Sequence, residues 1–562
     1  MPADVSAALR ELGRRRLEFG PDAAERKRAL LARLERARLG TARQVLLLHE
    51  ALCFMRAYPD DRALLARVER MLGRFERRAD LRRHRAALAD SGIAGTTIHY
   101  RFFASTAAWL ARRWPRRLTL EWKDFEHEDL LEALLPLLAH DAESPALDEY
   151  DDTLRAWLRR MKRPGESEAA FLILRLAARF KDPFLYEQLY DQLDPPLTLS
   201  PGAGTPSRTH AALGAARVAF QRAPLSPGRP DLRAEALRPP RSVRSVPPRE
   251  GQRLIDLALE AMVTRSRDLD VFTYGDPRDV RRVECGDGLA FACIGARPER
   301  RLLLESVYGF LTLKNGIPVG YVLTSALFGS SEIAYNVFET YRGAEAAPIY
   351  ARALAMTRHL FGTDTFTIYP YQLGDGNDEG LRSGAWWFYR KLGFAPRDGA
   401  ARRWMRAEEA RMRRRPAHRS SLATLARLAR HNVYLALGAP RADVIGMLPL
   451  ARVGMAAMRT MARRFGADRE AGAAACAREA AERLGVGSLT GWSADERHAW
   501  RRWAPLVTLL PDIERWSAGE KRAAADVIRA KGGRRESDFV WRFDAHAKLR
   551  AAVAQLARST RK

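Results

Sequence analysis

Arg342 and Gly343 stand between residues 331–338, which alternate like a strand, and residues 346–361, which have helical periodicity. Where a strand runs into a helix through a tight turn, several backbone N–H groups point at one spot. The helix dipole adds partial positive charge at the same place, so that a pyrophosphate can bind there. Arg342 and Gly343 fit a turn of this kind, which the strand before it and the helix after it must position.

Two clusters of acidic residues have spacings that resemble metal sites. Residues 375–380 match the first positions of a calcium loop, but Trp386 occupies the position at which such a loop needs a bidentate glutamate. We interpret this segment as an insertion between a strand and a helix. The acids at 124–129 precede the apolar run 130–138, where acidic residues stabilise the start of a helix. We therefore expect no bound metal.

The segments around the turn alternate in the manner of a sheet. We predict, in order, a helix at 254–262, a strand at 289–294, a hairpin of strands at 307–313 and 319–327, a strand at 331–338, a helix at 346–361, a strand at 365–371 and a helix at 383–392. The hairpin turn contains Asn315 and Gly316, and an Asn-Gly pair suits a tight hairpin because both of its central residues favour positive φ.

This order, together with three local motifs, resembles the GNAT acyltransferase superfamily over residues 251–405. The motifs are LKNGIPVGYV at 313–322, VFETYRG at 337–343 and AWWFYRKLGF at 385–394. They are similar to the family's third-strand hairpin, to the end of its fourth strand with the CoA pyrophosphate loop, and to its fourth helix. The resemblance implies an α+β domain, with helices on both faces of a mixed, mostly antiparallel sheet.

The resemblance also implies acetyl-CoA or another acyl-CoA as co-substrate. The residues that would bind it lie at the end of the fourth strand and in the following turn: Val337, Phe338, Arg342, Gly343, Ala344, Ala346 and Ala347. The family pattern has small residues, normally glycine, further along this turn, whereas the present chain has Glu345 at one such position. A carboxylate there would repel a pyrophosphate unless its side chain points away.

Acyl transfer to an amine needs a base for the amine proton, donors for the oxyanion and an acid for the leaving thiolate. By resemblance, Tyr389 is positioned as the acid; the alternative is a helix tyrosine with its ring in the core and its hydroxyl at the surface. Glu332 and Glu339 flank the fourth strand, and either is a candidate base, with Glu332 near the family's usual position. Backbone N–H groups at 336–338 would supply the oxyanion contact.

The rest of the chain is expected to be helical apart from a linker. We predict an all-α domain at 1–193, a Pro/Arg-rich linker at 194–250 with one short helix near 211–220, and a basic all-α domain at 406–562. About +16 of the formal net charge of +27 falls in that last region, and residues 250–405 are neutral. Binding to nucleic acid is possible, but a solvated arginine-rich surface is the commoner cause of such an excess.

The sequence contains neither a signal-peptide pattern at its start nor an uninterrupted apolar run of about 18 residues, so we expect a cytoplasmic protein with no membrane partner. The expected function is acyl-CoA-dependent N-acyl transfer to an unidentified amine acceptor. One alternative is a catalytically inactive GNAT-like scaffold, which Glu345 motivates. Another is an acyltransferase with a non-CoA donor such as aminoacyl-tRNA.

Overall fold

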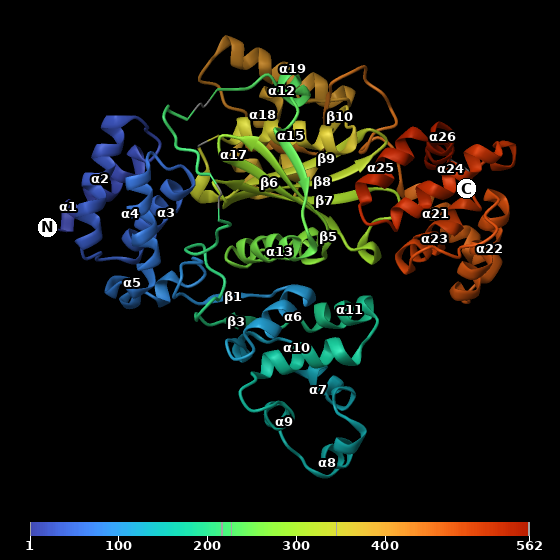
Figure 1. The fold of residues 1–562 in the computed structure, drawn as a ribbon, viewed down its shortest axis with the longest axis horizontal. Coiled ribbons are helices and arrows are strands. Elements are labelled where there is room, and N and C mark those ends of the chain that lie inside the picture. The colour runs from blue at the N-terminus through green and yellow to red at the C-terminus, as the bar shows by residue number, and fades with distance from the viewer. Residues whose placement is uncertain (1, 215–216, 226–227, 344, 560–562) are drawn as a thin grey trace. The chain divides into compact units, whose positions relative to one another are not determined.

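The computed structural model describes residues 2–214, 217–225, 228–343 and 345–559 (Figure 1). The chain divides into two compact units, neither of which is a single continuous segment. The first consists of Met1–Leu225, Arg253–Tyr274 and Lys314–Val319, and the second of Ser226–Gln252, Gly275–Leu313 and Gly320–Lys562. The expected boundary at 250 lies close to the division after Gln252, whereas no division falls near 193 or 405.

The first unit is built mainly from amphipathic helices. Early members include α1 (Pro2–Arg15), α2 (Pro21–Arg36), α3 (Ala42–Ala57) and α4 (Arg62–Gly73). Side chains of Thr41 and Asp61 accept hydrogen bonds from the first-turn N–H groups of α3 and α4, which explains where these helices begin. Their apolar faces form one buried cluster that includes Val45, Leu48 and Leu72.

A small antiparallel sheet also belongs to the first unit. Its strands are β1 (Ile98–Tyr100), β2 (Leu118–Leu120) and β3 (Leu197–Leu199), in the order β1-β3-β2. Helices α6 (Ala104–Arg113) and α10 (Glu168–Arg179) pack with this sheet in a second buried cluster. The expectation of helices alone was wrong here, because three-residue strands are too short to give an alternating pattern.

The expected linker at 194–250 is folded in part. It contains β3, α12 (Leu232–Leu237) and β4 (Ser242–Ser245), and the described residues of 211–220 are not helical. Asp231 caps α12 by accepting from two backbone N–H groups. Arg352 donates to the backbone oxygens of Arg238 and Pro239 at 3.1 and 2.9 Å, so this part of the segment lies packed against the second unit's own core.

The second unit is organised around a nine-stranded, mostly antiparallel sheet, with the order β11-β12-β10-β9-β8-β7-β6-β5-β4. Its other strands are β5 (Gly275–Gly286), β6 (Leu289–Ala296), β7 (Ser306–Lys314), β8 (Ile317–Leu327), β9 (Ser330–Val337), β10 (Thr365–Ile368), β11 (Ala395–Pro396) and β12 (Val433–Ala436). The hairpin prediction is confirmed: Asn315 and Gly316 have φ values of 50° and 78°.

Strand β12 overturns the expected boundary at residue 405. It is hydrogen-bonded between β10 and β11, so that a segment from the region expected to be all helical lies inside the sheet. The chain reaches it only after α19 (Gly399–Arg414) and α20 (Leu422–Ala429). A strand of four residues that follows two amphipathic helices in the sequence is too short to show an alternating pattern. The sequence therefore did not indicate β12.

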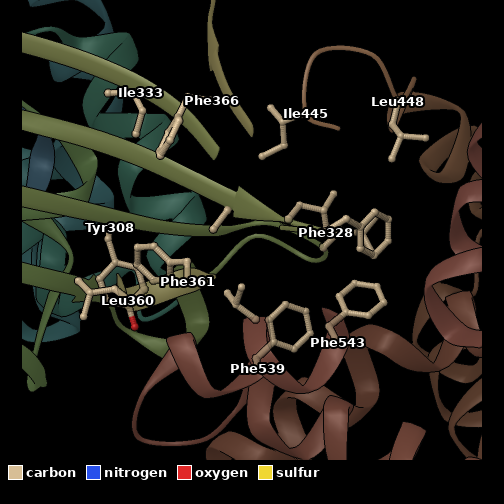
Figure 2. Close-up of a cluster of buried hydrophobic side chains, with 14 of the residues drawn as sticks. Tyr308, Phe328, Ile333, Leu360, Phe361, Phe366, Ile445, Leu448, Phe539 and Phe543 are labelled. Atoms are coloured by element: carbon tan, nitrogen blue, oxygen red, sulfur yellow. The ribbon is translucent and has the colours of Figure 1, made fainter. Parts of the chain in front are cut away.

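The C-terminal helices share the core of the sheet. The ring of Phe328, just after β8, packs on that of Phe543 in α25 (Glu536–Ala545), with 4.9 Å between the ring centroids. The ring centroid of Phe543 lies 5.5 Å from that of Trp503 in α23 (Ala494–Val507). Figure 2 shows the side chains of Phe539 and Phe543, both of α25, pointing toward those of Phe328 and Phe361. Residues after 405 therefore complete the second unit instead of forming a separate core.

A buried polar junction fixes the start of α25. The Asp279 carboxylate of β5 accepts from the backbone N–H of Glu536 at 3.1 Å and from the hydroxyl of Tyr308 at 2.5 Å. The Tyr308 oxygen in turn accepts from the backbone N–H of Ser537 at 2.9 Å. These contacts satisfy helix N–H groups that have no partner within the helix.

Among the described helices, none has the length and apolar character that crossing a bilayer requires.

Candidate active site

Strands β9 and β10 of the sheet separate after a short ladder, which leaves an interruption between them. These strands run parallel and share only three register pairs, which end at Glu332 opposite Thr367. Along its other edge β9 stays paired with β8 over its full length, from Ser330 to Val337. Within the described residues no other strand pairs with residues 333–337 on the β10 side. Backbone N–H and C=O groups of β9 that point to that side are therefore left without a strand partner.

Side chains on the two faces of β9 point to different surroundings. The ladder between β8 and β9 contains no bulge, so Glu332 and Tyr335, three residues apart, point to opposite faces of the sheet. The Tyr335 ring lies 5.2 Å from that of Tyr350 in α15 (Ala346–Phe361), and Tyr350 lies 5.7 Å from Tyr389 in α18 (Ala385–Lys391). Glu332 and Tyr389 thus approach the interruption from opposite faces.

Glu332 lies in a partly desolvated acidic environment. Burial raises the pKa of its carboxyl to about 7, and the negative charge of Glu305 adds to the effect. Burial also raises the pKa of Glu305, which precedes β7. The pKa of the Tyr369 phenol is raised by burial and by both carboxylates, which places the three groups in one neighbourhood. A carboxyl with a pKa near 7 can gain or lose a proton at neutral pH.

Glu339, the other candidate base, lies in a different environment. It begins the short helix Glu339–Tyr341 that follows β9, and its side chain is exposed. From Glu332 to the end of β9 at Val337 the strand rises about 17 Å, at roughly 3.3 Å per residue. The structure therefore does not bring the two glutamates together, and the desolvated one is Glu332.

The segment after β9 reaches α15 through the short helix Glu339–Tyr341, so the connection is longer than the tight turn that was expected. Phe338 is buried, Gly343 has φ 86°, a left-handed value that favours glycine, and α15 begins at Ala346. Ala346 and Ala347 are partly exposed at the start of the helix. Ala344 lies outside the described residues.

Two charged side chains of the turn differ from what a simple phosphate site would need. Arg342 is engaged by Glu379 at 2.6 Å and donates to the backbone oxygen of Val337 at 3.3 Å. Glu345 occupies the N-cap position of α15, but its side chain makes no capping hydrogen bond. Burial, then Tyr389, then the charge of Glu345 raise the pKa of Tyr335, so the Glu345 carboxylate lies within electrostatic reach of that strand residue.

Tyr389 is a core residue: its side chain is 4% exposed, and its ring packs on those of Tyr350 and Phe394. Burial raises the pKa of its phenol well above the ordinary value, so the hydroxyl keeps its proton at neutral pH. The adjacent Trp387 donates from its indole to the Ser420 hydroxyl at 3.1 Å, whereas Trp386 is fully buried.

Tyr350 and Glu305 were not singled out by the sequence. Tyr350 is fully buried and its hydroxyl has no hydrogen-bond partner within the described residues. The one feature by which the sequence could have indicated Tyr350 is its position as the fifth residue of α15. In the structure it lies on the side of that helix that faces α18. Glu305 is relevant because its charge raises the pKa of Glu332. No local sequence pattern shows that these two residues are close in the fold.

The free energy of unfolding of the Tyr350→Phe variant is expected to equal that of the natural protein or to exceed it by up to about 1 kcal/mol. The reason is that a buried hydroxyl without a partner costs free energy, and phenylalanine has the same shape without it. Urea unfolding of the two proteins measures the difference. A loss of more than about 1 kcal/mol would mean that the hydroxyl is satisfied in the folded protein.

The two acidic clusters at 124–129 and 375–380 contribute to helix starts and to an ion pair. Asn377 caps α17 (Asp378–Ser383) by accepting from Gly380 N, and Glu379 pairs with Arg342. At the other cluster α7 starts with Glu128 in its first turn (Glu128–Leu138). Across the described ranges of the chain, no group of three or more His, Cys, Asp or Glu side chains is placed to hold a metal.

No protein-family description, curated protein or solved structure matches this chain. The geometry of the interruption between β9 and β10 is therefore the basis on which a function can be argued.

Proposed function

We propose that the second unit is an acyl-CoA-dependent N-acyltransferase that acts on an amine acceptor. The observation that carries the proposal is the parting of β9 and β10 after Glu332, with Glu332 on one face of the sheet and Tyr389 on the other. If an acyl thioester lies at this interruption, the acceptor amine reaches it from the Glu332 face of the sheet. The sulfur of the thioester then lies toward the Tyr389 face.

The chemistry follows from the two side chains. Glu332 as a carboxylate takes a proton from the ammonium form of the acceptor, and the free amine attacks the thioester carbonyl to form a C–N bond. The tetrahedral intermediate collapses as the C–S bond breaks, and Tyr389 gives its phenolic proton to the leaving thiolate. Glu332 and the amine nitrogen each release a proton to solvent, and solvent restores that of Tyr389. A pKa of about 7 for Glu332 matches the requirement for a base at neutral pH.

The unpaired edge of β9 supports the same assignment. An extended chain that contains amide groups can hydrogen-bond to the N–H and C=O groups of residues 333–337 as an additional strand would. The pantetheine arm of CoA is such a chain. Beyond the strand end, the first-turn N–H groups of α15 have no acceptor within their own helix and would be available to a pyrophosphate.

One specific observation favours a second candidate, a GNAT-like scaffold without catalysis. Arg342 is paired with Glu379 and Glu345 stands at the N-cap of α15, so two carboxylates lie at the place where the resemblance puts the pyrophosphate. Phosphate binding would require the Arg342 ion pair to open. In the scaffold reading both acids stay in place, and the interruption between β9 and β10 holds no cofactor.

Calorimetric titration of the full chain with acetyl-CoA distinguishes the candidates. The full chain is needed, since a fragment ending at 405 would lack β12. We expect micromolar binding by the natural protein, and about tenfold tighter binding by Glu345→Gln, because removing one negative charge beside a pyrophosphate is worth roughly 1.4 kcal/mol. Glu339→Gln removes an exposed charge of the same sign nearby and serves as the matched control.

Binding that appears only in the Glu345→Gln protein would mean that the site is formed but disabled, and the scaffold would become the preferred function. The absence of binding in both proteins, with acetyl-CoA and with longer acyl-CoAs, would overturn the acyl-CoA proposal.

A further inference from the structure

The solvent face of α19 carries a single kind of functional group. Every exposed side chain of this helix larger than alanine is an arginine. With 100° between successive residues, Arg402, Arg406 and Arg413 fall in one row along the helix, and Arg403 and Arg414 fall in the row beside it. We call these five residues the α19 arginine stripe. In Figure 1, α19 lies at the outer edge of the second unit.

Both acidic residues of α19 are paired with basic side chains outside this stripe, although helical spacing places Glu409 in the row of Arg402 and Arg413. Glu408 is buried on the opposite side, where it accepts from Ser420 at 2.6 Å and contacts His418 and Arg411. Glu409 pairs with Arg390 of α18 at 2.7 Å. Within the described part of the chain, none of the five stripe arginines is ion-paired with a carboxylate. Asp398, just before the helix, accepts from Ala401 N. Arg402 donates from Nε to the backbone oxygen of Pro396 at 2.9 Å.

Such an arrangement carries an energetic cost in the free protein. Like charges three or four residues apart, such as those of Arg402 and Arg406, destabilise a helix by a few tenths of a kcal/mol per pair. The stripe extends over about 18 Å, at 1.5 Å per residue from Arg402 to Arg414. An anionic partner that offers several charges along this length would remove the repulsion.

The chemistry of the stripe selects among anionic partners. It holds guanidinium groups, which bind phosphate oxygens in bidentate fashion. It exposes no aromatic side chain on which unpaired bases could stack, and no large apolar side chain that could enter a lipid layer. We propose that α19 is a docking surface for the phosphate backbone of a nucleic-acid duplex, bound without sequence preference.

Fluorescence anisotropy of a labelled 20-base-pair DNA duplex tests this surface on the full chain, without acyl-CoA. If all five arginines contact phosphates, the slope of log affinity against log salt is about −4 to −5. Arg406→Gln with Arg413→Gln is expected to weaken binding at least tenfold and to reduce the slope by about two. The matched control, Arg501→Gln with Arg522→Gln, removes two exposed charges from α23 and α24 (Ala518–Lys531) and is expected to leave the slope unchanged.

Equal weakening by the two double variants would overturn the proposal, since binding would then follow net charge alone. The same holds if a single-stranded oligonucleotide or an anionic phosphatidylglycerol vesicle binds more tightly than the duplex. A transfer RNA is titrated in parallel as a duplex-bearing RNA, and loss of its binding in the α19 variant would support the same surface. Because no acyl donor is present, failure here leaves the proposed acyl transfer untouched.

Discussion

Replacing Glu332 by glutamine is expected to lower the rate of acyl transfer by about 10²- to 10³-fold at pH 8, because the amide cannot accept the amine proton. In the natural protein the rate should rise with pH through about 7, where the Glu332 carboxyl loses its own proton. In the variant this rise should disappear. Acyl transfer to a panel of primary amines, followed by release of the free thiol between pH 5.5 and 9, measures both effects.

Two comparisons separate a base from a structural residue. Glu339→Gln is expected to keep the rate and the rise near pH 7, since that side chain is exposed and lies beyond the end of β9. Tyr389→Phe is expected to lower the rate while keeping the rise, because burial holds the pKa of Tyr389 far above this range. An unchanged pH profile in Glu332→Gln would remove Glu332 from the mechanism.

The largest loss of stability is expected from Phe543→Ala, at about 3–5 kcal/mol. The ring is 1% exposed and packs on Phe328 next to the sheet and on Trp503 within the C-terminal helices. Because one core joins these helices to the sheet, the two should lose structure in a single shifted transition. Urea unfolding followed by tryptophan fluorescence and by far-UV circular dichroism tests whether the two signals move together.

Met458→Ala is the matched control, since that side chain is 59% exposed on α21 (Ala451–Phe465) and its loss should cost less than about 0.5 kcal/mol. A Phe543→Ala protein in which the helices unfold early while the sheet keeps its original midpoint would show that residues after 405 have a core of their own.

Local patterns were sufficient for the elements nearest the candidate site. The helices α15 and α18 and the hairpin at Asn315 were predicted within one or two residues, because each has a periodic apolar face and a recognisable start or turn. Strand β10 ends at Ile368, three residues earlier than predicted, since the chain turns at Pro370 into the short helix α16 (Pro370–Leu373). Strand β5 was missed before β6, where charged residues interrupt its alternation.

The candidate site could be assembled only partly from sequence. The turn with Arg342 and Gly343, and the tyrosine at 389, were placed by motif. Nothing in the motif could show that Glu379 takes up the guanidinium of Arg342, because these residues are 37 positions apart. The choice between the two candidate bases likewise depended on the burial of Glu332, to which the nearby charge of Glu305 adds, and both arise only when the sheet is formed.

The sequence by itself determined which segments become strands and helices around the turn, because periodicity and turn residues act over a few neighbouring positions. Only the tertiary structure decided that β12 enters between β10 and β11, that β9 and β10 part after Glu332, and that the C-terminal helices share the core of the sheet. These features arise from contacts between residues tens to hundreds of positions apart. Their free energy comes from burial and pairing across the fold, which no local window of sequence contains.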